Sequence, residues 1–65
     1  MKIILNDEEV QVSEPTTVRD LLAQRGIEEK GVAVAVDWAV LPRSRWESPL
    51  LDGSRVEVVT AVQGG

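Results

Sequence analysis

Neither cysteine nor histidine occurs among the 65 residues. Without cysteine there is no disulfide and no thiolate nucleophile. Without histidine, the side chain that most often transfers protons near neutral pH is missing, and so is the commonest metal ligand. These absences exclude the usual Cys-His and Ser-His catalytic arrangements. No carboxylate pair or metal-ligating cluster stands out either, so the sequence predicts a protein that is not an enzyme and binds no metal or cofactor of its own.

Basic residues and long apolar runs are also scarce. Seven Lys and Arg residues face eleven Asp and Glu residues, for a net charge of -4. Phosphate affinity comes mainly from clustered Lys and Arg, so this acidic chain is not expected to bind nucleic acid. No apolar run approaches the ~20 residues of a membrane-spanning helix, and no signal-peptide pattern is present. We therefore expect no membrane contact and a cytoplasmic location.

The pattern of apolar residues predicts one small α+β domain. Asn6 and Asp7 fit the turn of an N-terminal hairpin. Thr17 is expected to cap the single long helix, and Gly26 to end it. The predicted order is strand, strand, helix, strand, short strand, helical turn and strand, at residues 3–5, 10–12, 18–25, 32–36, 39–41, 42–47 and 55–60. One helix packed across one face of a mixed sheet buries these faces economically, with the first and last strands as central neighbours.

Alternation along the strands divides the apolar side chains between two faces. The face toward the helix is expected to carry Ile3, Leu5, Val34, Val36, Val56 and Val58, packed against Val18, Leu21 and Leu22. The open face is expected to carry Ile4, Ala33, Ala35 and Val59. Single exposed apolar residues are ordinary, but several on one side of a small acidic domain favour a docking surface for a partner.

The sequence ends in Val62-Gln63-Gly64-Gly65 directly after the last strand. Two glycines have no Cβ, so such a segment can thread a narrow slot. Its reactive group would be the α-carboxylate of Gly65. A frayed terminus is the alternative, since chain ends are often disordered. Residues 61–65 are accordingly predicted to be a flexible tail.

Residues 40–46 have the pattern apolar-apolar-Pro-Arg-x-x-Trp, and residues 51–58, around Asp52-Gly53, precede the terminal Gly64-Gly65. Both segments resemble those of the ThiS family of ubiquitin-like β-grasp sulfur carriers. The opening residues 1–6 and the helix entry 17–22 are similar as well. Trp38 departs from the family, which more often has a small or polar turn residue there. Trp46 is expected to be a partly buried cap at the core edge, and Arg43 and Arg45 a solvated surface.

The resemblance implies a carrier whose C-terminal Gly65 is adenylated and then converted to a thiocarboxylate that donates sulfur for the thiazole of thiamine. It implies a ThiF-like adenylating enzyme that supplies ATP and Mg²⁺, a sulfur donor protein and a ThiG-like thiazole synthase. Gly64 and Gln63 would thread into the partner, while Val62 would join Ile4, Ala33, Ala35 and Val59 in docking.

Three other functions fit parts of the same pattern. A MoaD-like carrier of molybdopterin synthesis shares the Gly-Gly chemistry, but such chains are usually longer and lack the Pro-Arg-x-x-Trp segment. A ubiquitin-like modifier would join Gly65 to a substrate lysine. A pure interaction module would carry out no chemistry at Gly65.

Overall fold

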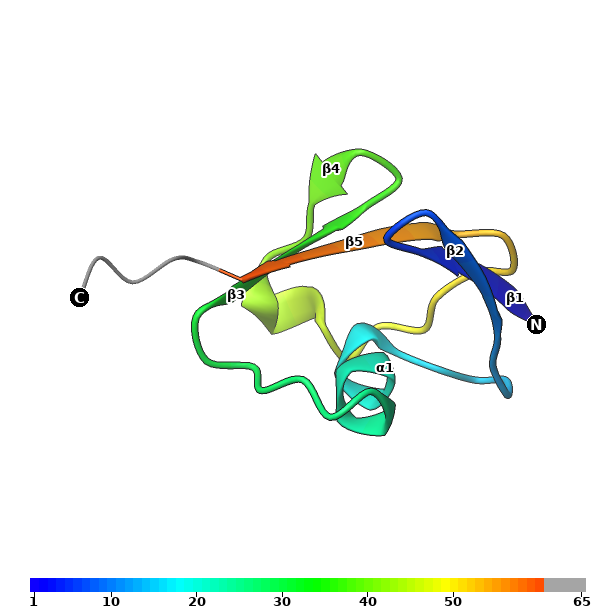
Figure 1. The fold of residues 1–65 in the computed structure, drawn as a ribbon, viewed down its shortest axis with the longest axis horizontal. Coiled ribbons are helices and arrows are strands. Elements are labelled where there is room, and N and C mark those ends of the chain that lie inside the picture. The colour runs from blue at the N-terminus through cyan, green and yellow to red at the C-terminus, as the bar shows by residue number, and fades with distance from the viewer. Residues whose placement is uncertain (61–65) are drawn as a thin grey trace.

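The computed structural model describes residues 1–60, which form a five-stranded mixed sheet with one helix across one face (Figure 1). The elements are β1 (Lys2–Leu5), β2 (Glu8–Gln11), α1 (Val18–Gln24), β3 (Val32–Val36), β4 (Ala39–Val40), η1 (Arg43–Arg45) and β5 (Arg55–Thr60). The strand order is β2-β1-β5-β3-β4. The predicted α+β architecture is confirmed, including β1 and β5 as neighbours.

β1 and β5 form the only parallel pair in this sheet, and the other pairs are antiparallel. Parallel strands need a long crossover, which the chain between β1 and β5 provides. Helix α1 lies within that crossover, on one side of the sheet (Figure 1). The opposite side has no helix over it in the described part of the chain.

The ends of α1 follow the sequence signals. Thr17 Oγ1 accepts a hydrogen bond from Asp20 N at 3.1 Å, and Thr17 N donates to Asp20 Oδ2 at 3.2 Å. This reciprocal capping box satisfies backbone donors that a helix start otherwise leaves unpaired. Gly26 follows the helix at φ +69°, the left-handed conformation that glycine adopts without strain.

Both hairpins turn on two residues with positive φ. Asn6 and Asp7 have φ 47° and 70°, and Asp37 and Trp38 have φ 50° and 72°. Two-residue loops with this geometry are type I′ turns, which match the twist of the strands. The predicted turns are confirmed, but β2 begins at Glu8 rather than residue 10 because so short a turn already pairs Glu8 with Leu5.

The core lies between α1 and the sheet. It contains Ile3, Leu5, Val18, Leu21, Leu22, Val34, Trp46, Leu50 and Val56, with Val36 and Val58 half-buried against it. The predicted helix-facing set is therefore confirmed. Leu50 was not predicted, because the residues around it show no strand or helix period.

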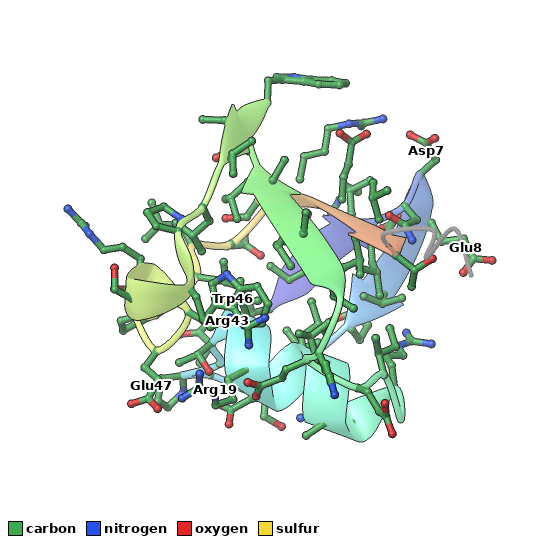
Figure 2. The ribbon with its side chains drawn as sticks, turned by 90° about the vertical axis from the view of Figure 1, so that its left-hand side faces the viewer. Asp7, Glu8, Arg19, Arg43, Trp46 and Glu47 are labelled. Atoms are coloured by element: carbon green, nitrogen blue, oxygen red, sulfur yellow. The ribbon has the colours of Figure 1, made fainter. Side chains whose placement is uncertain are left out.

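Trp46 corrects the expectation of a partly buried cap, since it is only 2% exposed and belongs to the core. The turn η1 brings it beneath the sheet, as Figure 2 shows. Its indole Nε1 donates to Leu41 O at 3.0 Å. The one polar atom of the ring thus has a partner, which is what makes full burial of a tryptophan favourable.

Candidate functional site

The last described strand carries the candidate site. Thr60 ends β5 and stands opposite Val32, the first residue of β3. We call residues 58–60 the tail root, because the C-terminal tail continues from them. Val62, Gln63, Gly64 and Gly65 lie outside the described residues, so the predictions about the flexible tail and its threading stay predictions.

The tail root is flanked unequally. On one side, the β3–β5 pairing runs from Val36 opposite Val56 to Val32 opposite Thr60, the last residue of β5. On the other side, β1 pairs with β5 only at Arg55 and Val56. Beyond that point, Asn6 Oδ1 accepts a hydrogen bond from Val58 N at 2.8 Å. Within residues 1–60, β3 is therefore the only strand that accompanies β5 to its end.

The four residues predicted for the open face do share that face. Ala33 stands opposite Val59, and Ala35 stands opposite Glu57 on one side and Val40 on the other. Directly opposed residues of antiparallel strands put their side chains on the same face. Val59 is 62% exposed and Val40 76%. Ile4 pairs with Arg55 near the other end of β5 and is half-buried.

Val40 belongs with this patch although the sequence reasoning did not select it. Its strand was predicted, but its place beside Ala35 depends on the register of the β3–β4 hairpin. The signal that could have identified Val40 is the two-residue turn at Asp37-Trp38, because a turn of that length sets the register of the two strands it joins. The apolar patch of the open face thus comprises Ala33, Ala35, Val40 and Val59. Whether it docks a partner stays a prediction.

Arg55 makes the opposite end of the open face charged. Its guanidinium lies 4.7 Å from the centre of the Trp38 ring and forms an ion pair with Asp7, and its Nε is 3.9 Å from Glu57 Oε2. Trp38 is 74% exposed. Figure 2 shows Asp7 at the far edge of the sheet from η1. The apolar patch therefore extends from the end of the sheet from which the tail leaves as far as Ala35, where it meets the charged pair of Glu57 and Arg55.

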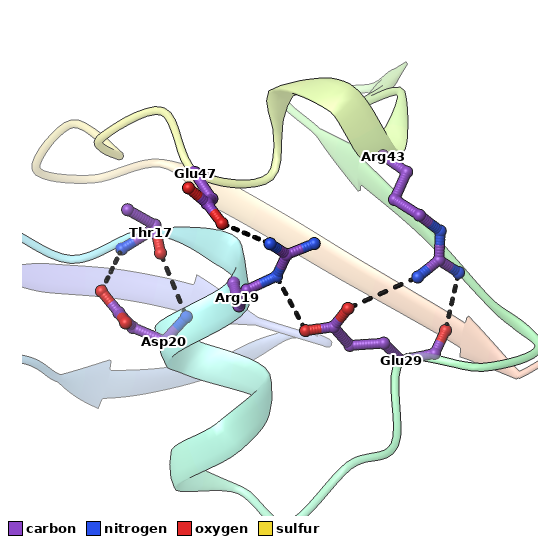
Figure 3. Close-up of polar contacts among 6 residues, drawn as sticks. All are labelled: Thr17, Arg19, Asp20, Glu29, Arg43 and Glu47. Atoms are coloured by element: carbon purple, nitrogen blue, oxygen red, sulfur yellow. Dashed lines mark hydrogen bonds and ion pairs between the residues drawn. The ribbon is translucent and has the colours of Figure 1, made fainter.

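A second polar group lies on the helix side, around the Pro-Arg-x-x-Trp segment (Figure 3). Arg19 Nε donates to Glu29 Oε2 at 2.8 Å, and its guanidinium also pairs with Glu47. Partial desolvation lowers the pKa of Arg19, but hydrogen bonds and charges from Glu29 and Glu47 raise it above its usual value on balance. Arg19 therefore stays a cation that links helix α1 to two other segments.

Arg43 is exposed, as expected of a solvated surface, but it also makes specific contacts. Its guanidinium carbon lies 4.5 Å above the Trp46 ring. Its Nη2 donates to the main-chain oxygen of Glu29 at 2.8 Å. The Arg and Trp of the segment are thus explained by packing, because one stacks upon the other. The side chain of Arg45 forms no hydrogen bond or ion pair with a described residue, although its main chain pairs with Pro42 and Ser48.

Small hollows occur on the described surface. The hollow between Val36, Leu41 and Leu51 has a volume of about 170 Å³, and the one between Thr17, Arg19 and Glu47 a volume of about 200 Å³. Ligand pockets typically measure about 300–1,000 Å³. Residues 1–60 contain no group of three side chains placed to hold a metal ion. No helix among them is long and apolar enough to cross a membrane.

Comparison with known proteins gives full-length matches. The model of the ThiS family matches residues 1–65. The sulfur carrier protein ThiS of Escherichia coli K12 is 30% identical over 66 residues, which span all of both chains. A thiazole synthase of Paramagnetospirillum magneticum is 33% identical over 66 residues, but this chain covers only 20% of that protein. The crystal structure of the thiamine biosynthesis protein ThiS of Geobacter metallireducens superposes with a TM-score of 0.82 at 26% identity, over the full length of both chains.

Proposed function

The chain belongs to the ThiS family of β-grasp sulfur carriers of thiamine biosynthesis, and on that basis we propose how its C-terminus carries sulfur. A ThiF-like adenylating enzyme binds the domain and places the Gly65 carboxylate beside ATP. An α-carboxyl group titrates near ~3.5, so it is an anion at neutral pH. This carboxylate attacks the α-phosphate of ATP, which gives a glycyl-adenylate and pyrophosphate. ATP and Mg²⁺ are bound by the partner, not by this chain.

The adenylate makes the Gly65 carbonyl carbon electrophilic. A sulfur nucleophile from a donor protein attacks that carbon and displaces AMP, which leaves with one of the former carboxylate oxygens. When the nucleophile is hydrosulfide, loss of its proton leaves Gly65 as a thiocarboxylate. When it is a persulfide of the donor, a second thiol attacks the donor's sulfur in the resulting acyl disulfide, which breaks the S–S bond and leaves its electron pair on the Gly65 sulfur as the thiocarboxylate. A ThiG-like thiazole synthase then takes this sulfur for the thiazole ring.

The observation that carries the proposal is the match over the whole chain to a sulfur carrier protein of the same length. Two further observations support it. The strand that leads into Gly64-Gly65 ends beside an exposed apolar patch that is suited to docking. A thiazole synthase carries a segment similar to this chain within its own polypeptide, which supports a ThiG-like partner. The cytoplasmic location stays a prediction.

Intact-mass measurement tests the proposal. The protein is incubated with its ThiF-like enzyme, ATP, Mg²⁺ and a sulfide source. We expect the mass change of one oxygen replaced by sulfur, located at Gly65 by fragmentation. Adding the thiazole synthase and its substrates should remove that sulfur. No mass change with an enzyme that is active on another carrier would contradict the proposal.

Two variants serve as controls for the same measurement. Gly64→Leu, or one residue added after Gly65, should abolish the mass change, because the tail then no longer fits a narrow slot or no longer ends at Gly65. Both changes lie beyond residues 1–60, among which the core residues are found, so we expect the circular dichroism spectrum to be unaltered. Unchanged turnover in either variant would show that the reaction does not occur at Gly65.

A further inference from the structure

Four charged side chains connect three segments that lie outside the sheet. Arg19 belongs to α1, Glu29 to the α1–β3 loop, Arg43 to η1, and Glu47 follows η1. Figure 3 shows them as a continuous series, from Glu47 through Arg19 and Glu29 to Arg43. We call these four residues the ion-pair cluster.

The cluster holds the main chain of the α1–β3 loop at Glu29. Arg43 Nη2 binds Glu29 O at 2.8 Å, and Arg43 Nη1 lies 3.4 Å from Glu29 Oε1. The other carboxylate oxygen of Glu29 accepts from Arg19 Nε at 2.8 Å. Arg43 in turn stacks on Trp46, whose side chain is buried in the core. The α1–β3 loop is thus connected through Arg43 to the core.

The ion-pair cluster is not expected to contribute much to the free energy of unfolding of the whole domain. The side chains of Arg19, Arg43 and Glu47 are all more than one-third exposed. Ion pairs of that kind contribute little to the free energy of unfolding, because water and salt screen them. Their main effect is therefore local, on the conformation of the loop they hold.

That loop leads directly to the neighbour of the tail root. Glu29 precedes Val32 by three residues, and Val32 stands opposite Thr60. On the other flank, β1 has already ended, and the Asn6 side chain contacts Val58 N but no later residue of the described strand. The position of Thr60 thus depends on the start of β3, and the start of β3 depends on the loop.

We propose that Arg43 and Glu29 are positioning residues for the C-terminal tail: they hold the α1–β3 loop so that the start of β3 keeps the tail root in the direction the adenylating enzyme requires. This proposal rests on the proposed function of Gly65. If the contacts of Arg43 with Glu29 are lost, a smaller fraction of the carrier molecules has the tail direction that the adenylating enzyme binds. The apparent affinity of the carrier for the enzyme then falls in proportion to that fraction, while the bound complex reacts as before.

Hydrogen exchange in the free protein tests the structural half of the proposal. Arg43→Ala is compared with Arg45→Ala, because Arg45 belongs to the same turn and its side chain has no polar partner among the described residues. We expect the amides of Ala33 and Val59, which stand opposite each other in β3 and β5, to exchange faster in Arg43→Ala by up to about fivefold, the scale of an exposed ion pair. Arg45→Ala should match the unaltered protein. Equal exchange in all three proteins would overturn the proposal, whether or not Gly65 is ever adenylated.

Adenylation kinetics test the functional half. Arg43→Ala and Glu29→Ala should raise KM for the carrier by about two- to fivefold and leave kcat within about twofold, since only the competent fraction changes. Arg45→Ala and Glu28→Ala are the matched controls, since Glu28 is an exposed residue of the same loop whose side chain has no polar partner among the described residues. Both variants should leave KM and kcat unaltered. A purely structural role would lower Tm without changing KM well below Tm, and that result would overturn the proposal. If the unaltered protein is not adenylated at all, the proposed function fails, and the exchange experiment still decides the structural half.

Discussion

The two tryptophans offer a matched test of how the fold is held together. Trp46 is 2% exposed and Trp38 is 74% exposed. Replacing Trp46 by Phe removes the donor to Leu41 O and part of the buried ring. Loss of such a hydrogen bond costs about 1 kcal/mol, and the missing ring volume adds about 1 kcal/mol more. We therefore expect Trp46→Phe to lower the free energy of unfolding by about 2 kcal/mol.

That loss is large for so small a domain. At ~0.05–0.15 kcal/mol per residue, the whole domain has about 3–10 kcal/mol of stability. Trp46→Ala, at about 3–5 kcal/mol, is therefore expected to leave much of the protein unfolded. For Trp46→Phe, Tm should fall by about 8–16 °C, since 1 kcal/mol corresponds to about 4–8 °C in a domain of this size.

Urea unfolding followed by far-ultraviolet circular dichroism is the appropriate assay, because the substitutions themselves change tryptophan fluorescence. Trp38→Phe is the control and should stay within about 0.5 kcal/mol of the unaltered protein, as exposed substitutions usually do. If Trp46→Phe also stayed within that range, or if Trp38→Phe cost as much, the assignment of Trp46 to the core would be refuted.

Three further changes test the helix cap, the strained turn and the open face. Thr17→Ala removes the acceptor for Asp20 N and should cost about 1 kcal/mol in urea unfolding; an unchanged midpoint would mean that the cap is not needed. Trp38→Gly relieves a left-handed conformation that costs a non-glycine residue about 1 kcal/mol. This gain offsets the lost stacking on Arg55, so the free energy of unfolding measured in urea should not fall. A clear decrease would contradict this balance. Val59→Asp puts a charge in the apolar patch. Because burying an unpaired charge in an interface is costly, it should weaken binding to the ThiF-like or ThiG-like enzyme about tenfold, measured by calorimetry, while the fold is retained. Unaltered affinity would exclude the patch as the docking surface.

Local signals in the sequence were sufficient for most of the secondary structure. Asn6-Asp7, Thr17 and Gly26 act within a few residues of themselves, through turn geometry and helix capping. Period-two alternation correctly separated the core face from the open face, because side chains on a strand point alternately to opposite sides. The boundaries were less accurate, and the polar Glu8-Glu9 start of β2 was missed because this edge strand buries little.

The sequence by itself also determined the family, since Pro42-Arg43, Trp46, Asp52-Gly53 and the terminal glycines stand at characteristic separations. Only the tertiary structure decided what several of these residues do. The burial of Trp46 depends on its packing against residues of both α1 and the sheet. The contacts of Arg43 with Glu29 join residues fourteen positions apart, and the pairing of Val32 with Thr60 depends on strand register across the whole domain. Contacts of this kind follow from packing between distant segments, and no local propensity specifies them.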